Sequence, residues 1–287
     1  MKITKVGSMG GGQDGAIYGS EVFRFQANGS CRVYDISISE DKREVACQKK
    51  AAFTLDRADL IVPHSNAVCF GTEFYAPGDE YPLLYSNIYN NYAGAEDKRI
   101  GVCLVYRIER TGSEYRSTLV QMIEIGFTED ASLWRATPEA HGVRPYGNFV
   151  IDTERRALWA FVMRNEELGT RYFRFDLPSV REGAIDPLLG IPHVILEARD
   201  IREYFDGPYQ RFMQGATLYG GKIYSTEGFT ASEVNRPGLR VIDLAAHSEE
   251  YVDMLSLGFI EEAEFISHLG DVCLYSDARG AIYTVEN

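Results

Sequence analysis

The sequence predicts an all-β fold and, within that class, a β-propeller. Short segments rich in Val, Ile, Tyr and Phe recur along the chain between Gly, Asn and Asp turns, which is typical of β-strands. Three of these segments share an alternating or apolar strand with an Asp as its second-to-last residue: 32–36, 172–177 and 239–244. Of the 287 residues, 45% are hydrophobic and 25% are charged, a composition that excludes disordered, collagen-like and coiled-coil proteins.

Internal similarity divides the chain into repeated units. Residues 14–23 and 214–224 both contain small residues at the start, a short apolar strand, a Gly-centred turn and an alternating strand. The pattern extends to five units, which begin at Gln13, His64, near Tyr146, at Gln214 and near Glu264. We therefore expect one domain over residues 1–287, built as a propeller of five four-stranded blades.

The ends of the chain complete one another in this scheme. The last unit contains strands near residues 265–266, 271–275 and 280–285, and then lacks a fourth strand. Residues 2–6 alternate with the period of a strand and precede the first unit. We expect this N-terminal strand to close the last blade, because closure removes an exposed sheet edge.

Two insertions bear on the number of blades. About 40–45 residues per blade is common, and the surplus falls in residues 76–99 and 178–211. Extra strands in either insertion would raise the count to six or seven blades. Helical periodicity is weak, and residues 201–205 and 130–134 are predicted to form short helical turns.

Charge and cysteine usage restrict the partners. The chain carries 42 acidic and 29 basic residues, a net charge of −13, which argues against nucleic acid and anionic membranes as partners.

The chain lacks an apolar run of about 20 residues and a signal-peptide pattern, so we expect a cytoplasmic protein or one secreted after processing. The cysteines are scattered and are expected to be buried free thiols: Cys31, Cys47, Cys69, Cys103 and Cys273.

The candidate site follows from the propeller geometry. The first strand of each blade lines the central channel, and its start lies on one face. Polar residues stand at these starts: Gln13, Asp14, His64, Asn66, Tyr146, Asn148, Gln214, Glu262 and Glu264. A second polar ring is expected from the turns between second and third strands: Asn28, residues 87–92 with Tyr92, Asn165, Glu227 and Asp277. We expect these rings to form the mouth of the channel.

These residues suggest three kinds of chemistry. Asp14, His64 and Glu264 are the candidate catalytic residues, because carboxylates and an imidazole can exchange protons with a substrate. The candidate ligand-binding residues are Gln13, Asn66, Tyr92, Tyr146, Asn148, Gln214, Glu227 and Glu262. The same carboxylates could hold a divalent cation such as calcium in the channel. Polar residues also line such a channel simply because water fills it.

One motif competes with the propeller. Residues 10–15 match the dinucleotide-binding pattern G-x-G-x-x-G, and Asp35 follows Gly15 by 20 positions. That interpretation requires a helix over residues 16–28, whereas Gly19 and the sequence from Val22 to Phe25 favour strands. We expect residues 10–12 to be a flexible link between the closing strand and the first blade.

A family resemblance rests on residues 213–228, M-Q-G-A-T-L-Y-G-G-K-I-Y-S-T-E-G. This segment resembles a blade of the glutamine cyclotransferase-like five-bladed propellers, which read Q-G, an apolar strand and then G-K-L-Y-x-S. The resemblance implies that Gln214 lies at the channel, that Glu227 lies near an acidic, substrate-facing region, and that the activity is cyclisation of N-terminal glutamine. The other blades do not repeat Q-G, and the first has Asp14 before its glycine.

We therefore expect a binding module whose mouth takes a small polar molecule, a carbohydrate or a peptide. The first alternative is an enzyme on the same face: a cyclotransferase, a lactonase or a glycosidase. A central channel that is dry, or plugged by hydrogen-bonded side chains, would instead indicate a protein-interaction scaffold with no small-molecule site.

Overall fold

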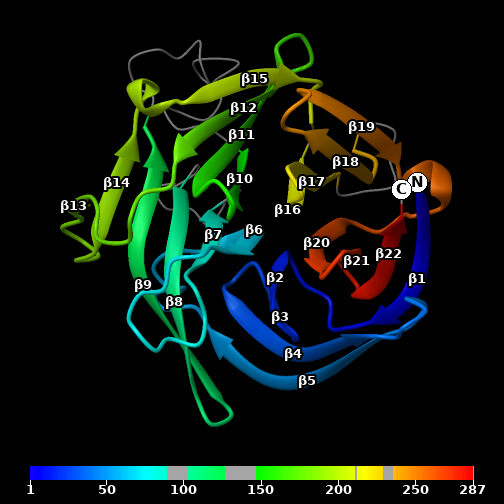
Figure 1. Ribbon diagram of the computed structural model, residues 1–287, viewed down its shortest axis with the longest axis horizontal. Helices are drawn as coiled ribbons and strands as arrows, with labels where there is room; N and C mark the ends of the chain where they lie inside the picture. Colours follow the sequence, from blue (N-terminus) through cyan, green and yellow to red (C-terminus); the bar gives the residue numbers. More distant parts are fainter. Residues whose placement is uncertain (89–101, 127–146, 211, 229–234, 287) are drawn as a thin grey trace.

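The chain forms a ring of antiparallel sheets, as the sequence predicts (Figure 1). The structure is a computed structural model that describes residues 1–88, 102–126, 147–210, 212–228 and 235–286. Within these ranges the regular elements are β-strands and two short 3-10 turns, η2 (Ala198–Asp200) and η3 (Leu255–Leu257). The all-β propeller prediction is therefore confirmed, and no described helix is long and apolar enough to cross a bilayer.

The described strands form four hydrogen-bonded sheets, of eight, six, four and four strands. For description we divide them in chain order into five groups, here called blades 1 to 5, of which blades 1 and 5 share the eight-stranded sheet. Blade 1 contains β2 (Gly15–Tyr18), β3 (Glu21–Phe25), β4 (Ser30–Ile38) and β5 (Val45–Thr54). Blade 2 contains β6 (His64–Phe70), β7 (Leu84–Ile88), β8 (Val102–Thr111) and β9 (Glu114–Ile125). Blade 3 contains β10 (Gly147–Asp152), β11 (Ala157–Asn165), β12 (Gly169–Asp176) and β15 (Glu203–Gly207). Blade 4 contains β16 (Met213–Tyr219), β17 (Lys222–Glu227), β18 (Gly238–Asp243) and β19 (Ser248–Asp253). Blade 5 contains β20 (Ala263–Leu269), β21 (Val272–Asp277), β22 (Ala281–Glu286) and, from the other end of the chain, β1 (Lys2–Ser8).

Closure of the last blade by the N-terminal strand is confirmed. β1 pairs antiparallel with β22, from Lys2 opposite Glu286 to Ser8 opposite Ala281. It also meets β5 of blade 1 in parallel, at Gly7 opposite Val45, so blades 1 and 5 form one continuous sheet. The two chain ends lie side by side in Figure 1.

The insertion at residues 178–211 widens one blade and completes another. β13 (Ala184–Ile185) and β14 (Pro192–Leu196) extend blade 2, with β14 parallel to β9. The predicted helical turn at residues 201–205 is wrong, because the chain enters β15 there. Phe205 on β15 stacks on Tyr172 of β12 with ring centroids 4.8 Å apart, a contact that sequence periodicity does not reveal. The segment 130–134 and residues 89–99 of the other insertion lie outside the described residues.

The hydrophobic core lies between neighbouring blades rather than in one central cluster. Trp159, Phe161 and Tyr172 of blade 3, for example, form a buried cluster with Ile223 and Ile242 of blade 4. The cysteines are free; Cys31, Cys103 and Cys273 are buried, while Cys47 and Cys69 are partly buried.

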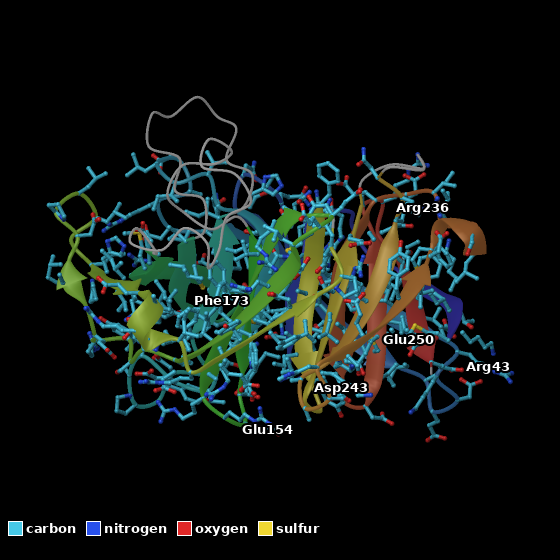
Figure 2. The ribbon with its side chains drawn as sticks, turned by 90° about the horizontal axis from the view of Figure 1, so that it is seen from above. Arg43, Glu154, Phe173, Arg236, Asp243 and Glu250 are labelled. Atoms are coloured by element: carbon cyan, nitrogen blue, oxygen red, sulfur yellow. The ribbon has the colours of Figure 1, made fainter. Side chains whose placement is uncertain are left out.

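The ring has two faces, which Figure 2 shows edge-on: Arg236 lies near one face and Asp243 near the other. These residues flank or end β18, which runs from one face to the other. The inner strands begin on the Arg236 side, because Met213 at the start of β16 pairs with Glu227, and Glu227 pairs with Gly238. We call this side the mouth.

Candidate functional site

The buried side chain of Asp14 joins four blades. Its Oδ2 accepts hydrogen bonds from the backbone amides of Val68 at 3.0 Å and Ala216 at 3.3 Å, and its Oδ1 accepts from Ile266 at 3.4 Å. These amides belong to the inner strands of blades 2, 4 and 5, whereas Asp14 precedes the inner strand of blade 1. The side chain is fully buried. Burial raises the pKa of Asp14 well above its usual value, while the amides and Arg24 oppose the rise. These contacts tie the inner strands together, and the catalytic role of Asp14 stays a prediction.

Buried amide side chains tie the remaining inner strands together. Asn66 Nδ2 donates to Met213 O at 2.9 Å and to Gln214 Oε1 at 2.8 Å. Asn148 Nδ2 donates to Gln214 O at 2.5 Å, and Asn87 Nδ2 donates to Asn148 Oδ1 at 2.5 Å. At this level, hydrogen-bonded side chains connect blades 2, 3 and 4.

A layer of four side chains, two of them partly exposed, lies beside these contacts. Gln13 Nε2 donates to Glu264 Oε1 at 2.9 Å, and Gln214 Nε2 donates to Glu262 Oε1 at 2.6 Å. Gln13 and Glu262 are partly exposed, while Glu264 is 1% exposed. Four of the predicted residues therefore meet in one place.

The two glutamates of this layer interact with each other. Burial raises the pKa of Glu264 well above its usual value, and the charge of Glu262 raises it further, whereas Arg24 lowers it. Burial also raises the pKa of Glu262, opposed by its hydrogen bonds to Glu264 and Gln214. Like charges that share a site disfavour double ionisation, so the pair retains a proton above the usual glutamate range.

Sequence reasoning missed Arg24, the buried cation beside these carboxyls. Its Nη2 donates to Gly12 O at 2.8 Å and to Asp277 O at 3.2 Å, and its guanidinium lies 5.2 Å from the ring centroid of Phe265. Burial lowers the pKa of Arg24 to about 10, opposed mainly by Glu264 and Asp14. Its Nε and Nη1 are buried and lack a hydrogen-bond partner among the described residues. A charged residue between Phe23 and Phe25 in an apolar strand was the available signal.

The Gly10–Gly12 segment is fixed rather than flexible, which corrects the expectation for this link. Gln26 Nε2 and Arg32 Nη1 donate to Gly11 O at 2.6 and 3.2 Å, and Tyr34 Oη accepts from Gly10 N at 3.0 Å. A Cβ at Gly11 would lie 2.2 Å from Ala278 O. β2 and β3 stand where dinucleotide binding requires a helix, so the motif is not a dinucleotide site. The glycines instead allow close packing between blades 1 and 5.

His64 occupies an unusual backbone position at the start of β6. His64 and Ser65 both have φ of 58°, in the left-handed region that β-strand residues rarely adopt. The amide of His64 donates to Ala27 O at 3.0 Å, and Ser65 O accepts from the amide of Asp14 at 3.2 Å. Burial lowers the pKa of the His64 imidazole. The residue is half-buried next to the Asp14 backbone.

The second predicted ring stabilises turns and blades. Glu227 accepts two hydrogen bonds from Arg240, at 2.9 and 3.1 Å, and both side chains are buried. Asp277 Oδ1 accepts from the amides of Arg279 and Ala281, both at 3.0 Å. Asn28 is exposed and accepts from Ser30 N at 3.0 Å. Tyr92 and Tyr146 lie outside the described residues, as does the side chain of Asn165 at the end of β11.

The predicted divalent cation has no ligand cluster in the described part of the chain. There, no three His, Cys, Asp or Glu side chains are arranged to hold a metal ion. The oxygens of Asp14, one of the carboxylates of that hypothesis, accept backbone amides.

Comparison with known proteins identifies no family. No family model matches the chain. No curated protein matches it either. Similar solved structures include BamB from Moraxella catarrhalis (8% identity, TM-score 0.32, 92% of this chain and 54% of that chain). Virginiamycin B lyase from Staphylococcus aureus is similar at 11% identity and TM-score 0.40, over 99% of this chain and 98% of the other. The β-propeller domain of Cps50 (Swd1) from Myceliophteria thermophila is similar at 11% identity and TM-score 0.33, over 93% and 68%. This chain spans about half the length of the BamB chain, and none of these similarities bears on what it binds.

Proposed function

We propose that residues 1–287 form a single five-bladed propeller domain that binds a small polar ligand at the mouth, over Gln13, Glu262 and Glu264. The observation that carries this proposal is a set of buried polar atoms without partners in one layer. Among the described residues, Glu264 Oε2, Gln13 Oε1 and Arg24 Nε and Nη1 lack hydrogen bonds. Buried polar groups are usually satisfied, and such groups beside a half-exposed layer suit a ligand that supplies the missing bonds.

The chemistry of the layer favours a ligand with hydroxyl or amine groups. Two carboxyls that share a proton can both accept and donate hydrogen bonds, and the amide of Gln13 offers both functions. Carbohydrates and peptide N-termini carry such groups. The predicted contacts of Tyr92 and Tyr146 with a ligand, and the predicted catalytic role of His64, stay predictions.

The test is a binding screen with a matched pair of variants. Monosaccharides, disaccharides and short peptides would be screened by thermal shift and then by calorimetry. Glu262→Gln should weaken binding of any hit at least tenfold, because it removes one carboxyl from the layer. Glu261→Gln, next to it in sequence and paired with Arg279 at 3.0 Å, should leave binding unchanged. Equal affinity in both variants and the parent would place the ligand elsewhere.

The carboxyl pair also supports a second candidate, acid–base catalysis on the same face. Carboxyls with a raised pKa are typical of general acids. The glutamine cyclotransferase resemblance receives less support, because Gln214 is held by Asn66 and Glu262, and Glu227 by Arg240. Incubation with glutaminyl peptides and detection of released ammonia tests that activity directly. Turnover that survives Glu264→Gln would exclude Glu264 as the acid.

A further inference from the structure

An open cavity of about 440 Å³ lies at the end of blade 3 where β11 turns into β12. Its described lining comes from that turn, from Arg171 on β12 and from residues 206–209 at the end of β15. Gln13, Glu262 and Glu264 do not line it. The cavity is therefore separate from the layer at the mouth and independent of the function proposed there.

Arg164 lies buried in the wall of this cavity and has an unsatisfied donor. The residue is 8% exposed. Its Nη2 donates to Leu168 O and lies 3.0 Å from Asp206 Oδ1. Its Nε is buried and has no hydrogen-bond partner among the described residues. Buried donors are usually satisfied, so a ligand in the cavity can supply the acceptor that Arg164 lacks.

A second guanidinium group stands beside Arg164 and shares its carboxylate. Arg171 donates to both oxygens of Asp206, from Nε at 2.6 Å and from Nη2 at 2.7 Å. Burial lowers the pKa of Arg164; Asp206 opposes this change and the charge of Arg171 adds to it. An arginine nevertheless stays charged at neutral pH. The buried end of the cavity therefore favours an acceptor that carries negative charge, such as a carboxylate.

Two further carboxylates stand at the opening of the cavity. Glu166 and Glu167 line it from the β11–β12 turn, and both are exposed, whereas Arg164 is buried. A simple anion would meet the two glutamates, and a simple cation would meet the two arginines. A ligand with a carboxylate at one end and an ammonium group at the other is complementary to both parts of the lining.

We propose that this cavity binds a zwitterionic amino acid, whose carboxylate accepts the Nε–H of Arg164 and whose ammonium group faces Glu167. The volume lies within the range of small-molecule sites, about 300–1,000 Å³. Leu168, which is 41% exposed, and Pro208 also line the cavity and offer apolar contact to a side chain. An aliphatic amino acid such as leucine is therefore the suitable probe.

The experiment compares leucine with two analogues that each lack one charge. The compound 4-methylpentanoate lacks the ammonium group, and 3-methylbutylamine lacks the carboxylate. Calorimetry or ligand-observed NMR at pH 7.5 should give the parent protein an affinity for leucine about tenfold higher than for either analogue. Equal affinity for leucine and one analogue, or no binding of leucine at millimolar concentration, would overturn the proposal.

Glu167→Gln tests the ammonium end at an exposed position, where the substitution should not disturb folding. The variant should bind leucine about tenfold more weakly and 4-methylpentanoate no more weakly than the parent. Glu154→Gln is the matched control, because Glu154 is exposed near the opposite face of the ring (Figure 2), and it should bind leucine like the parent. Parent affinity for leucine in Glu167→Gln would contradict the proposed orientation of the ligand.

Arg164→Met tests the carboxylate end. It should abolish the preference for leucine over 3-methylbutylamine. Arg174→Met is the control, because Arg174 pairs with Glu203 at 3.0 Å at the other end of blade 3. If Arg164→Met does not fold, Glu167→Gln decides the matter. Glu262→Gln should bind leucine like the parent; a loss of affinity there would place leucine at the mouth and refute a site at blade 3.

Discussion

Asp14 Oδ2 accepts the backbone amide of Ala216 at 3.3 Å, across 202 positions of sequence. The same oxygen accepts the amide of Val68, so one carboxylate oxygen joins blades 1, 2 and 4. A side chain with this position holds the inner strands at fixed distances from one another. Loss of ligand binding on substitution of Asp14 would therefore not identify it as a catalytic residue.

Substitution of Asp14 should lower stability in steps. Asp14→Asn replaces one carboxyl oxygen, which accepts a hydrogen bond from a backbone amide, by an N–H₂ group, which cannot accept one. The change should lower the free energy of unfolding by about 1–3 kcal/mol. Asp14→Ala leaves the amides of Val68, Ala216 and Ile266 unpaired and should cost more. Urea unfolding followed by circular dichroism measures both. Asp41→Asn, in an exposed turn, is the control; wild-type stability of Asp14→Ala would refute the structural role.

Removal of β1 should destabilise the whole ring. Deletion of residues 1–8 exposes the edge of β22 and removes the buried side chain of Val6 from the core. We expect a large fall in the unfolding temperature and self-association through the new edge, measured by calorimetry and size-exclusion chromatography. Val6→Ala should cost about 1–3 kcal/mol. Lys5→Ala, whose side chain is exposed, should cost nearly nothing, and a deletion variant as stable as the parent would contradict closure.

The Glu262–Glu264 pair should make stability fall as pH rises. The folded-state pKa of both groups is raised above the usual 4.5, so the folded chain holds a proton that the unfolded chain has already released. That stabilisation is complete below pH 4.5 and is lost as pH rises through the folded-state values. Glu264→Gln should flatten this dependence.

Carboxyl ¹³C NMR measures the same pair directly. Glu264 should titrate above pH 4.5, and Glu262→Gln should lower its pKa, because the charge of Glu262 helps to raise it. Glu261→Gln should not change it. A Glu264 pKa at or below 4.5 would be incompatible with the buried pair.

Gly11→Ala should reveal that the glycine segment is fixed. The added Cβ would lie 2.2 Å from Ala278 O, so blades 1 and 5 would have to separate, at a cost of about 1–3 kcal/mol. Gly112→Asn is the control. Gly112 has a positive φ, which Asn tolerates, and no atom lies within 4 Å of its ideal Cβ position. Equal chemical unfolding curves for the two variants would restore the flexible-link interpretation.

The fold was predictable because its signals are local. Alternating strands, Gly turns and strands that reach Asp repeat within each unit, and the missing last strand identified residues 2–6 as its supplier. β14 was not predictable in the same way, because its partner β9 lies in the preceding blade and pairs in parallel. Phe205 was misassigned for a similar reason, since its stacking partner Tyr172 lies in another strand.

The positions of the candidate residues were predictable, but their hydrogen-bond partners were not. Gln13, Gln214, Glu262 and Glu264 were expected to meet, and they do. Sequence does not distinguish a carboxylate that accepts backbone amides, such as Asp14, from one with an unsatisfied oxygen, such as Glu264. Arg24 was missed because its partners are carbonyl groups of Gly12 and Asp277, which leave no side-chain pattern to find.

The pairing of Lys2 with Glu286 also sets an order of events during synthesis. β1 leaves the ribosome before β22 is made. At a synthesis rate of about 5–20 residues per second, β1 has no β22 to pair with for tens of seconds. During that time β2 to β5 can assemble as blade 1. β1 can then pair with the edge of β5, which it meets at Gly7 in the folded protein. That early contact would hold the first strand beside the place where the last one must arrive.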